Sequence, residues 1–304
     1  MEILYLLETL RMPWLTKLML LVTQFGEETA FLVTALVVFW CVDKKKGYFL
    51  MSVGFVTTML NQMLKLICRI PRPWVLDGEF TIVEEARAAA TGYSFPSGHS
   101  QSAVGTFGGL AGVTRNKWVR GIAIAIAVLV PLSRMYLGVH TPADVLVGSG
   151  ISLFLIFGLR FVANTDNEKH MKVLIAGMLM LALVFFVYAN FWHFPQDIDG
   201  HNLESAVKNA YTMMGCLVGV AVVYIAERRY VNFDTEAVWW AQILKAVLGL
   251  GVVLAVKEGL RGPLEALCAD AMAARGVRYF LIVITAGLLW PMTFRWFGKM
   301  GDRK

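Results

Sequence analysis

Charged residues are scarce in this 304-residue chain, and their scarcity excludes an ordinary soluble domain. Asp, Glu, Lys and Arg together make up only 16% of the sequence, whereas apolar residues make up 57%. The mean hydropathy is +0.60, which exceeds what the core of a soluble protein requires. No low-complexity linker or internal repeat divides the chain. The composition therefore predicts an all-α, polytopic integral membrane protein built as a helix bundle.

Cysteines and metal-ligand patterns are equally sparse. Of the four cysteines, Cys68 and Cys268 fall in loops expected on the same membrane face, so a disulfide between them stays open. Two unpaired small residues are the favoured interpretation. The carboxylates of the loops show no spacing that would fix the coordination geometry of a cation. We therefore expect neither a metal nor another cofactor.

Apolar segments long enough to cross a bilayer, which takes about 20 residues of helix, occur nine times. They cover residues 26–42, 47–67, 98–114, 119–138, 142–161, 172–190, 208–226, 238–256 and 278–296. Residues 1–25 differ, because Glu8, Arg11 and Lys17 interrupt an apolar stretch that Pro13 also breaks. We interpret this segment as an amphipathic helix lying at the outer interface, with a tenth span as the alternative. It lacks the basic start and small-residue cleavage site of a signal peptide.

Basic residues accumulate in alternate loops, which predicts the orientation. The basic groups lie within residues 44–46, 115–120, 160–172, 228–229 and 295–304, the last group including Arg303 and Lys304. Lys and Arg in short loops favour the cytoplasm, so the C-terminus is predicted inside and the N-terminus outside. Lys65, Arg72 and Arg134 remain on the extracytoplasmic face against this bias, which suggests an anionic substrate. We expect a multi-pass protein of a bacterial cytoplasmic membrane.

A histidine and an aspartate lie where one predicted helix begins. In Thr141-Pro142-Ala143-Asp144 the threonine can cap the helix and proline suits its first turn. Asp144 could therefore simply complete a capping box. The alternative is a pair with His140, because an ionisable residue at the membrane boundary is costly unless it has a partner. Histidine is a suitable nucleophile near pH 7, since its neutral form is abundant there.

Three clusters along the chain form one pattern: Lys65 with Arg72-Pro73, then Pro96-Ser97-Gly98-His99, then Ser133-Arg134 with His140 and Asp144. A lone cation at a span end would usually be a snorkelling anchor. In this order and spacing, however, the clusters match K-x6-R-P, P-S-G-H and S-R-x5-H-x3-D, so the chain resembles the type 2 phosphatidic acid phosphatase (PAP2) superfamily.

This resemblance implies a role for each matched residue in metal-independent phosphoryl transfer. His140 would attack phosphorus and form a phosphohistidine, Asp144 would orient its ring, and His99 would act as acid and then as base. The resemblance assigns phosphate binding to Lys65, Arg72, Ser97, Gly98 and Arg134. It also implies a catalytic core over residues 26–165, preceded by the helix of residues 1–25 and followed by additional membrane helices over residues 166–304, packed on the core.

Three functions remain open from the sequence. The leading one is hydrolysis of a phosphomonoester or pyrophosphate of a lipid, such as phosphatidic acid, phosphatidylglycerol phosphate or a polyprenyl pyrophosphate, at the extracytoplasmic face. The second is the same chemistry on a soluble sugar phosphate, because the topology is similar to that of the glucose-6-phosphatase branch. The third is a lipid or phosphate transporter, although no inverted repeat supports it. Membrane lipids are expected partners, nucleic acid is not, and the oligomeric state is left open.

Overall fold

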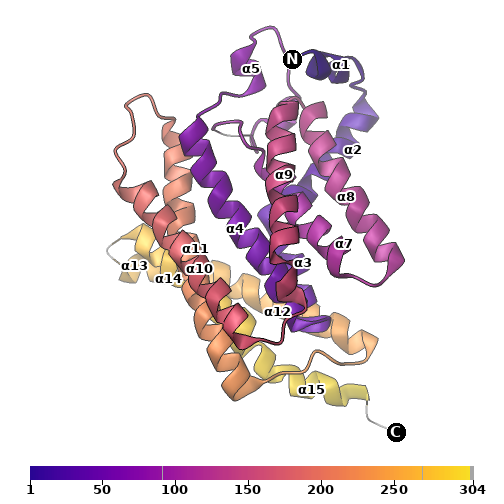
Figure 1. The fold of residues 1–304 in the computed structure, drawn as a ribbon, viewed down its shortest axis with the longest axis vertical. Helices are drawn as coiled ribbons and strands as arrows, with labels where there is room; N and C mark the ends of the chain where they lie inside the picture. Colours follow the sequence, from indigo (N-terminus) through magenta and orange to yellow (C-terminus); the bar gives the residue numbers. More distant parts are fainter. Residues whose placement is uncertain (91, 269, 302–304) are drawn as a thin grey trace. The chain divides into compact units, whose positions relative to one another are not determined.

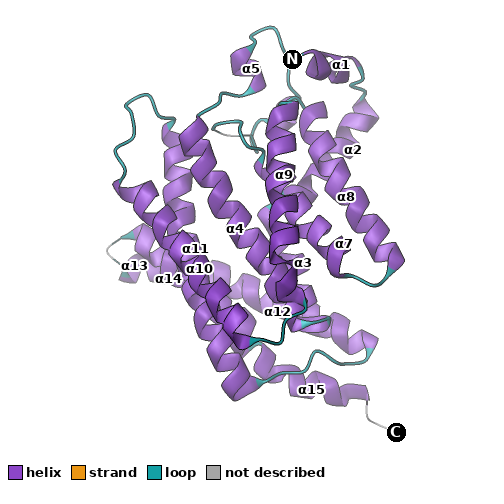
Figure 2. Ribbon diagram, in the orientation of Figure 1, coloured by secondary structure: helices purple, strands orange, loops and turns teal. Residues whose placement is uncertain are grey.

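The computed structural model describes residues 1–90, 92–268 and 270–301, and in these ranges it contains helices and loops but no strand (Figure 2). The predicted all-α class is therefore confirmed. Arg303 and Lys304, which contributed to the basic C-terminal group, lie outside the described residues. None of the four cysteines, which all lie within the described ranges, forms a disulfide, in line with the favoured interpretation.

Within the described residues, seven helices are long and apolar enough to span a membrane, which confirms a polytopic membrane protein. They are Lys44–Leu76, Lys117–Tyr136, Pro142–Ala163, Glu168–Phe191, Gly200–Val231, Trp239–Leu267 and Ala271–Gly298. An eighth span results if Pro13–Gly26 and Glu28–Cys41, bent by 54° relative to each other, count as one.

The two further segments predicted to span lack sufficient helix. α3 (Glu28–Cys41) has only 14 residues. Residues 98–113 form short consecutive segments, α6 (Gly98–Ala103), η3 (Val104–Gly108) and α7 (Gly109–Val113), of 6, 5 and 5 residues. Both fall short of the bilayer thickness as single helices, so the count is seven or eight among the described residues, where the sequence predicted nine.

The N-terminal segment forms two helices, α1 (Glu2–Thr9) and α2 (Pro13–Thr23). Pro13 lies at the start of α2, where its missing N–H and fixed φ suit the first turn. The location of residues 1–25 at the membrane interface stays a prediction.

The first compact unit contains all the predicted site residues and comprises Met1–Thr34, Phe49–Phe161 and Phe191–Ala206. In it α6 packs against both α8 (Lys117–Tyr136) and α9 (Pro142–Leu159), while α2 packs along α8 (Figure 1). The buried side chains of Ala103, Phe107 and Val130 belong to one apolar cluster of this packing. The long loop after α4 (Lys44–Cys68) leads along the chain to α6.

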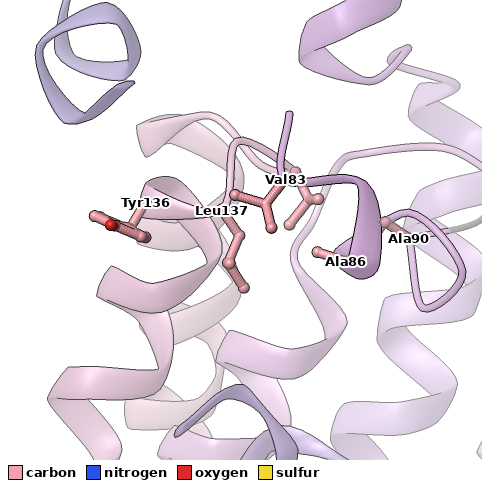
Figure 3. Packing of buried hydrophobic residues seen from close by; sticks show 6 residues of the cluster. Val83, Ala86, Ala90, Tyr136 and Leu137 are labelled. Atoms are coloured by element: carbon pink, nitrogen blue, oxygen red, sulfur yellow. The ribbon is translucent and has the colours of Figure 1, made fainter. Parts of the chain in front are cut away.

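An apolar cluster anchors this loop to the end of α8. Val83, Ala86 and Ala90 pack against Tyr136 and Leu137 (Figure 3). The Val83 backbone N–H also donates to the Leu137 carbonyl at 3.1 Å. Burying a Val or Leu side chain contributes roughly 1.5–3 kcal/mol. The cluster therefore stabilises both the loop and the end of α8 that precedes His140.

The second unit comprises Ala35–Tyr48, Val162–Asn190 and Val207–Lys304. It includes α12 (Trp239–Gly259) and α14 (Ala271–Ile284) together with most of α10 (Glu168–Phe191) and α11 (Gly200–Ala226). Glycine permits a close crossing of α11 and α14: a Cβ at Gly215 would lie 2.1 Å from the carbonyl oxygen of Gly276. Gly219, one turn further along α11, faces Val283. This small-xxx-small contact is the usual basis of tight helix packing in membranes.

Candidate active site

His140 occupies the turn between α8 and α9, and a glycine shapes that turn. Gly138 has φ +79°, in the left-handed region, and a Cβ there would lie 2.7 Å from an Arg11 nitrogen. A side chain at this position would therefore be both strained and obstructed. The next residue, Val139, donates its N–H to the Arg134 carbonyl at 3.1 Å, so the turn fixes the position of His140 relative to the end of α8.

Asp144 both caps α9 and contacts His140, so the two interpretations of this residue hold together. Its Oδ2 accepts the Thr141 N–H at 2.7 Å, and its own N–H donates to Thr141 Oγ1 at 3.3 Å, which completes the capping box. The same Oδ2 lies 3.4 Å from His140 Nδ1. Ser94 donates its hydroxyl to this oxygen at 2.5 Å. The His140 side chain is 2% exposed and that of Asp144 is 1% exposed.

The neighbours of the two ring nitrogens define the tautomer of His140. Arg72 Nη1 lies 2.9 Å from Nε2, and a guanidinium can only donate, so Nε2 must carry the lone pair. Nδ1 faces the Asp144 carboxylate and therefore carries the proton. Nε2 is consequently the nitrogen that can act as a nucleophile, once an anion draws the Arg72 guanidinium away from it.

Burial keeps His140 neutral. Burial is the main cause that lowers the pKa of His140 well below its ordinary value, and the positive charges of Arg72, Arg134 and Lys65 lower it further. Near pH 7 the imidazole therefore keeps its lone pair. All three cations, although distant in sequence, therefore act electrostatically on this ring.

Lys65 and Arg72 are tied to the backbone of the loop that contains Ser94. Lys65 Nζ donates to the Tyr93 carbonyl at 3.0 Å, and Arg72 Nε donates to the Gly92 carbonyl at 3.0 Å. Gly92 has φ +64°, and a Cβ there would lie 2.5 Å from Asn202 Oδ1. The loop conformation that holds both cations thus requires glycine at position 92.

Neighbouring helices hold the Pro96-Ser97-Gly98-His99 turn. Ser97 is the N-cap of α6, and its Oγ accepts the Ser100 N–H at 3.4 Å. Its own N–H donates to the Asp144 carbonyl at 3.0 Å. Asn61 of α4 donates to the Pro96 carbonyl at 3.2 Å. The first N–H groups of α6, including those of Gly98 and His99, are therefore presented at a helix start, where they favour an anion.

The site contains buried polar atoms that lack a partner within the described residues: His99 Nε2 and Nε and Nη2 of Arg134. Arg134 is 1% exposed, and only its Nη1 is satisfied, by Thr23 Oγ1 at 2.9 Å. Gly26, in the turn η1 (Gln24–Gly26), leaves no room beside His99, since a Cβ there would lie 2.9 Å from His99 Cβ. Buried donors without acceptors are costly, so these atoms indicate a ligand rich in acceptor oxygens.

The structure thus brings together the predicted His99, His140 and Asp144 with the predicted cations. The roles assigned to these three residues and to the residues expected to bind phosphate stay predictions. Sequence reasoning missed Ser94, Thr23, Asn202 and Gln101, the last of which accepts from Asn61 at 2.7 Å. Ser94 lies two residues before the Pro-Ser-Gly-His motif, which is a weak signal, whereas nothing local marked Thr23.

Comparison with known proteins gives two family matches along the chain. Residues 45–168 match the PAP2 superfamily, and residues 211–302 match the transmembrane extension of PAP2 superfamily phosphatases. No solved structure matches the chain.

Curated relatives match at 28–33% identity. The undecaprenyl-diphosphatase of Sulfolobus acidocaldarius is 31% identical over 159 residues, 52% of this chain and 75% of the relative. The phosphatidylglycerophosphatase B of Bacillus subtilis is 33% identical over 163 residues, 49% of this chain and 75% of the relative. A Bacillus subtilis undecaprenyl-diphosphatase is 28% identical over 113 residues, 37% of this chain and 54% of the relative.

The three motifs all lie within the matched range of residues 45–168, and the relatives that share this range carry phosphatase names. The chain therefore belongs to the PAP2 superfamily and is a multi-pass membrane phosphatase, a phosphoric ester hydrolase with the superfamily's transmembrane extension on its C-terminal side.

Proposed function

We propose that the protein hydrolyses a phosphomonoester or pyrophosphate of a lipid at the extracytoplasmic face, without a metal, through a phosphohistidine on His140. The observation that carries this proposal is the set of buried nitrogens of His99 and Arg134 that have no partner within the described residues, beside cations that also act on His140. The names of the relatives, undecaprenyl-diphosphatase and phosphatidylglycerophosphatase B, support a phosphorylated lipid as the substrate.

In the first step, His140 Nε2 attacks phosphorus while the bond from phosphorus to the leaving oxygen breaks. His99 gives a proton to that oxygen, so the lipid alcohol or lipid monophosphate leaves neutralised. Burial, and after it the charge of Arg134, lowers the pKa of His99 well below its ordinary value, so the ring takes up this proton only when the negative phosphate group is bound. The new P–N bond makes the His140 ring positive, and Asp144 Oδ2, 3.4 Å from Nδ1, stabilises that charge. Lys65, Arg72 and Arg134 stabilise the charge on the phosphoryl oxygens.

In the second step, His99, now neutral, takes a proton from water, and the resulting hydroxide oxygen bonds to phosphorus. The P–N bond breaks and its electron pair returns to His140 Nε2. Inorganic phosphate leaves, His99 is protonated again, and the ring keeps its Nδ1 proton. No oxidant, reductant or metal enters the balance.

The sidedness of the proposal depends on the distribution of Lys and Arg among the loops. That distribution supports a cytoplasmic C-terminus and an extracytoplasmic site, in a bacterial membrane. An extracytoplasmic site suits a substrate whose phosphate is exposed at the outer leaflet.

The decisive experiment measures phosphate release by the purified protein in the presence of EDTA. The substrates are phosphatidic acid, phosphatidylglycerol phosphate, a polyprenyl pyrophosphate and glucose 6-phosphate. Wild type is compared with His140→Ala and with His193→Ala, a control at an exposed histidine. We expect release from a lipid, full activity in the control and no release by His140→Ala.

Normal turnover by His140→Ala would refute the phosphohistidine. Release only without EDTA would refute metal independence. Preference for glucose 6-phosphate would transfer the assignment to the sugar phosphate alternative. Quenching in alkaline SDS during turnover on a ³²P-labelled substrate, followed by detection of base-stable, acid-labile label on the wild type alone, would identify the intermediate directly.

A further inference from the structure

The transmembrane extension contains two arginines on one face of α14 (Ala271–Ile284), distinct from the catalytic motifs. Arg278 is 8% exposed, and Arg275, one turn before it, is half-buried. The guanidinium carbons of both lie near the ring of Tyr279, at 5.7 and 5.3 Å from its centroid. Both positive charges therefore lie near one aromatic ring of a membrane-spanning helix.

Neither guanidinium has a carboxylate partner among the residues that the structure describes. Arg275 Nε donates to Thr212 Oγ1 of α11 at 2.8 Å, a neutral acceptor. Arg278 Nε is buried and has no hydrogen-bond partner in the described part of the chain. Two carboxylates that precede the arginines closely in sequence have other partners. Glu265 pairs with Arg261 at 3.4 Å, and Asp270 caps α14 by accepting the Met272 N–H at 2.8 Å.

An ion pair elsewhere in the same unit gives a comparison. Lys44 Nζ lies 2.9 Å from Glu227 Oε1, so that cation has a carboxylate of its own. A charged side chain inside a membrane helix is expensive unless it has such a partner or binds a ligand. A cation–π contact with Tyr279 attracts the guanidiniums but leaves their charge in place.

The depth of the pair fits a phosphate at the boundary between headgroups and acyl chains. Arg278 lies about 10 Å along the axis from the first residue of α14, at 1.5 Å per residue. Lipid headgroups and the interfacial region occupy roughly the outer 5–8 Å of each leaflet. The arginine side chains can reach that region.

We propose that Arg275 and Arg278 form a second anion site, which binds the phosphate group of an anionic phospholipid or a free phosphate. Arginine suits this ligand because its planar guanidinium donates two parallel hydrogen bonds to phosphate oxygens. Tyr279 keeps both guanidiniums in place, and Thr212 fixes Arg275 against α11. The site uses none of the residues of the proposed catalytic mechanism and does not depend on it.

The test is native mass spectrometry of the full chain released from nanodiscs. One arm compares phosphatidylcholine nanodiscs with nanodiscs that also contain phosphatidylglycerol, and the other adds inorganic phosphate to phosphatidylcholine nanodiscs. Wild type is compared with Arg278→Gln and with Arg261→Gln, a matched control at an exposed arginine of α13 (Arg261–Leu267). Because phosphate can also enter the catalytic site, each arm is read as the difference between wild type and Arg278→Gln.

We expect occupancy of one phosphate-bearing molecule to fall about tenfold or more in Arg278→Gln and to stay unchanged in Arg261→Gln. A loss confined to the phosphatidylglycerol arm identifies a lipid headgroup, and a loss in the phosphate arm identifies free phosphate. Equal occupancy of wild type and Arg278→Gln in both arms overturns the proposal. If Arg278→Gln does not fold, Arg275→Gln replaces it, and equal occupancy in that variant and the wild type overturns the proposal in the same way.

Discussion

Replacing Thr23 by Val tests whether the N-terminal segment positions a catalytic cation. Thr23 is buried, and its Oγ1 is the acceptor for Arg134 Nη1 at 2.9 Å. Valine has nearly the same shape, so the variant removes the acceptor without leaving a cavity. Nη1 would then join Nε and Nη2 of Arg134 as a buried donor without a partner.

A hydrogen bond to a charged group contributes about 1.5–3 kcal/mol, and about 1.4 kcal/mol corresponds to tenfold in rate. If the Thr23 contact fixes Arg134 where the phosphoryl oxygens develop charge, Thr23→Val should lower kcat/KM about 10- to 100-fold. The assay is phosphate release from the preferred lipid by purified variants. Thr23→Ser, which keeps the hydroxyl, should retain most of the activity.

The thermal unfolding midpoint of each variant separates positioning from folding. Loss of kcat/KM in Thr23→Val with an unchanged midpoint supports positioning. Wild-type kcat/KM in Thr23→Val would show that Arg134 orients without this contact, and the reasoning from the unpartnered nitrogens would then be wrong.

Three further predictions concern the nucleophile and the fold. Asp144→Asn should reduce kcat by about 100-fold and still release measurable phosphate, whereas His140→Ala should release none; equal loss in both variants would contradict an orienting role. Since only neutral His140 attacks and its pKa is lowered, kcat/KM should hold as pH falls through about 6.5 and decline only below it; a decline that begins above pH 6.5 would contradict this. Gly215→Leu has no room against the Gly276 carbonyl and should destabilise the protein by about 1–3 kcal/mol or more, seen as a lower unfolding midpoint; an unchanged midpoint would show that the helix crossing is not tight.

Local patterns in the sequence predicted the parts of the site that depend on neighbouring residues. The helix start at Thr141-Pro142 and the cap at Asp144 follow from residue types three positions apart, and the structure contains both. The contact of Asp144 with His140 follows from the same short range. The membrane character followed from composition alone, because apolar content does not depend on how the helices pack.

Contacts between distant segments could not be predicted in this way. Thr23 and Arg134 are 111 residues apart, and a threonine in an apolar helix carries no signal of its partner. The same limit applies to Asn202, which abuts Gly92 from the first turn of α11. The span count differed for a related reason: hydropathy over residues 98–114 measures apolarity and does not register that the helix there is divided into short segments.

The motif residues specify which charges the site contains, but residues outside the motifs determine where those charges point. The match to the PAP2 superfamily begins at residue 45, yet Thr23 holds Arg134 and Gly26 packs against His99 from the segment before it. Substitutions in that segment could therefore reorient Arg134 and His99 without altering any of the three motifs. Because a shift of about 1 Å at a reacting group can cost roughly 100-fold in rate, the N-terminal segment is a place where activity or substrate preference can change while all three motifs stay intact.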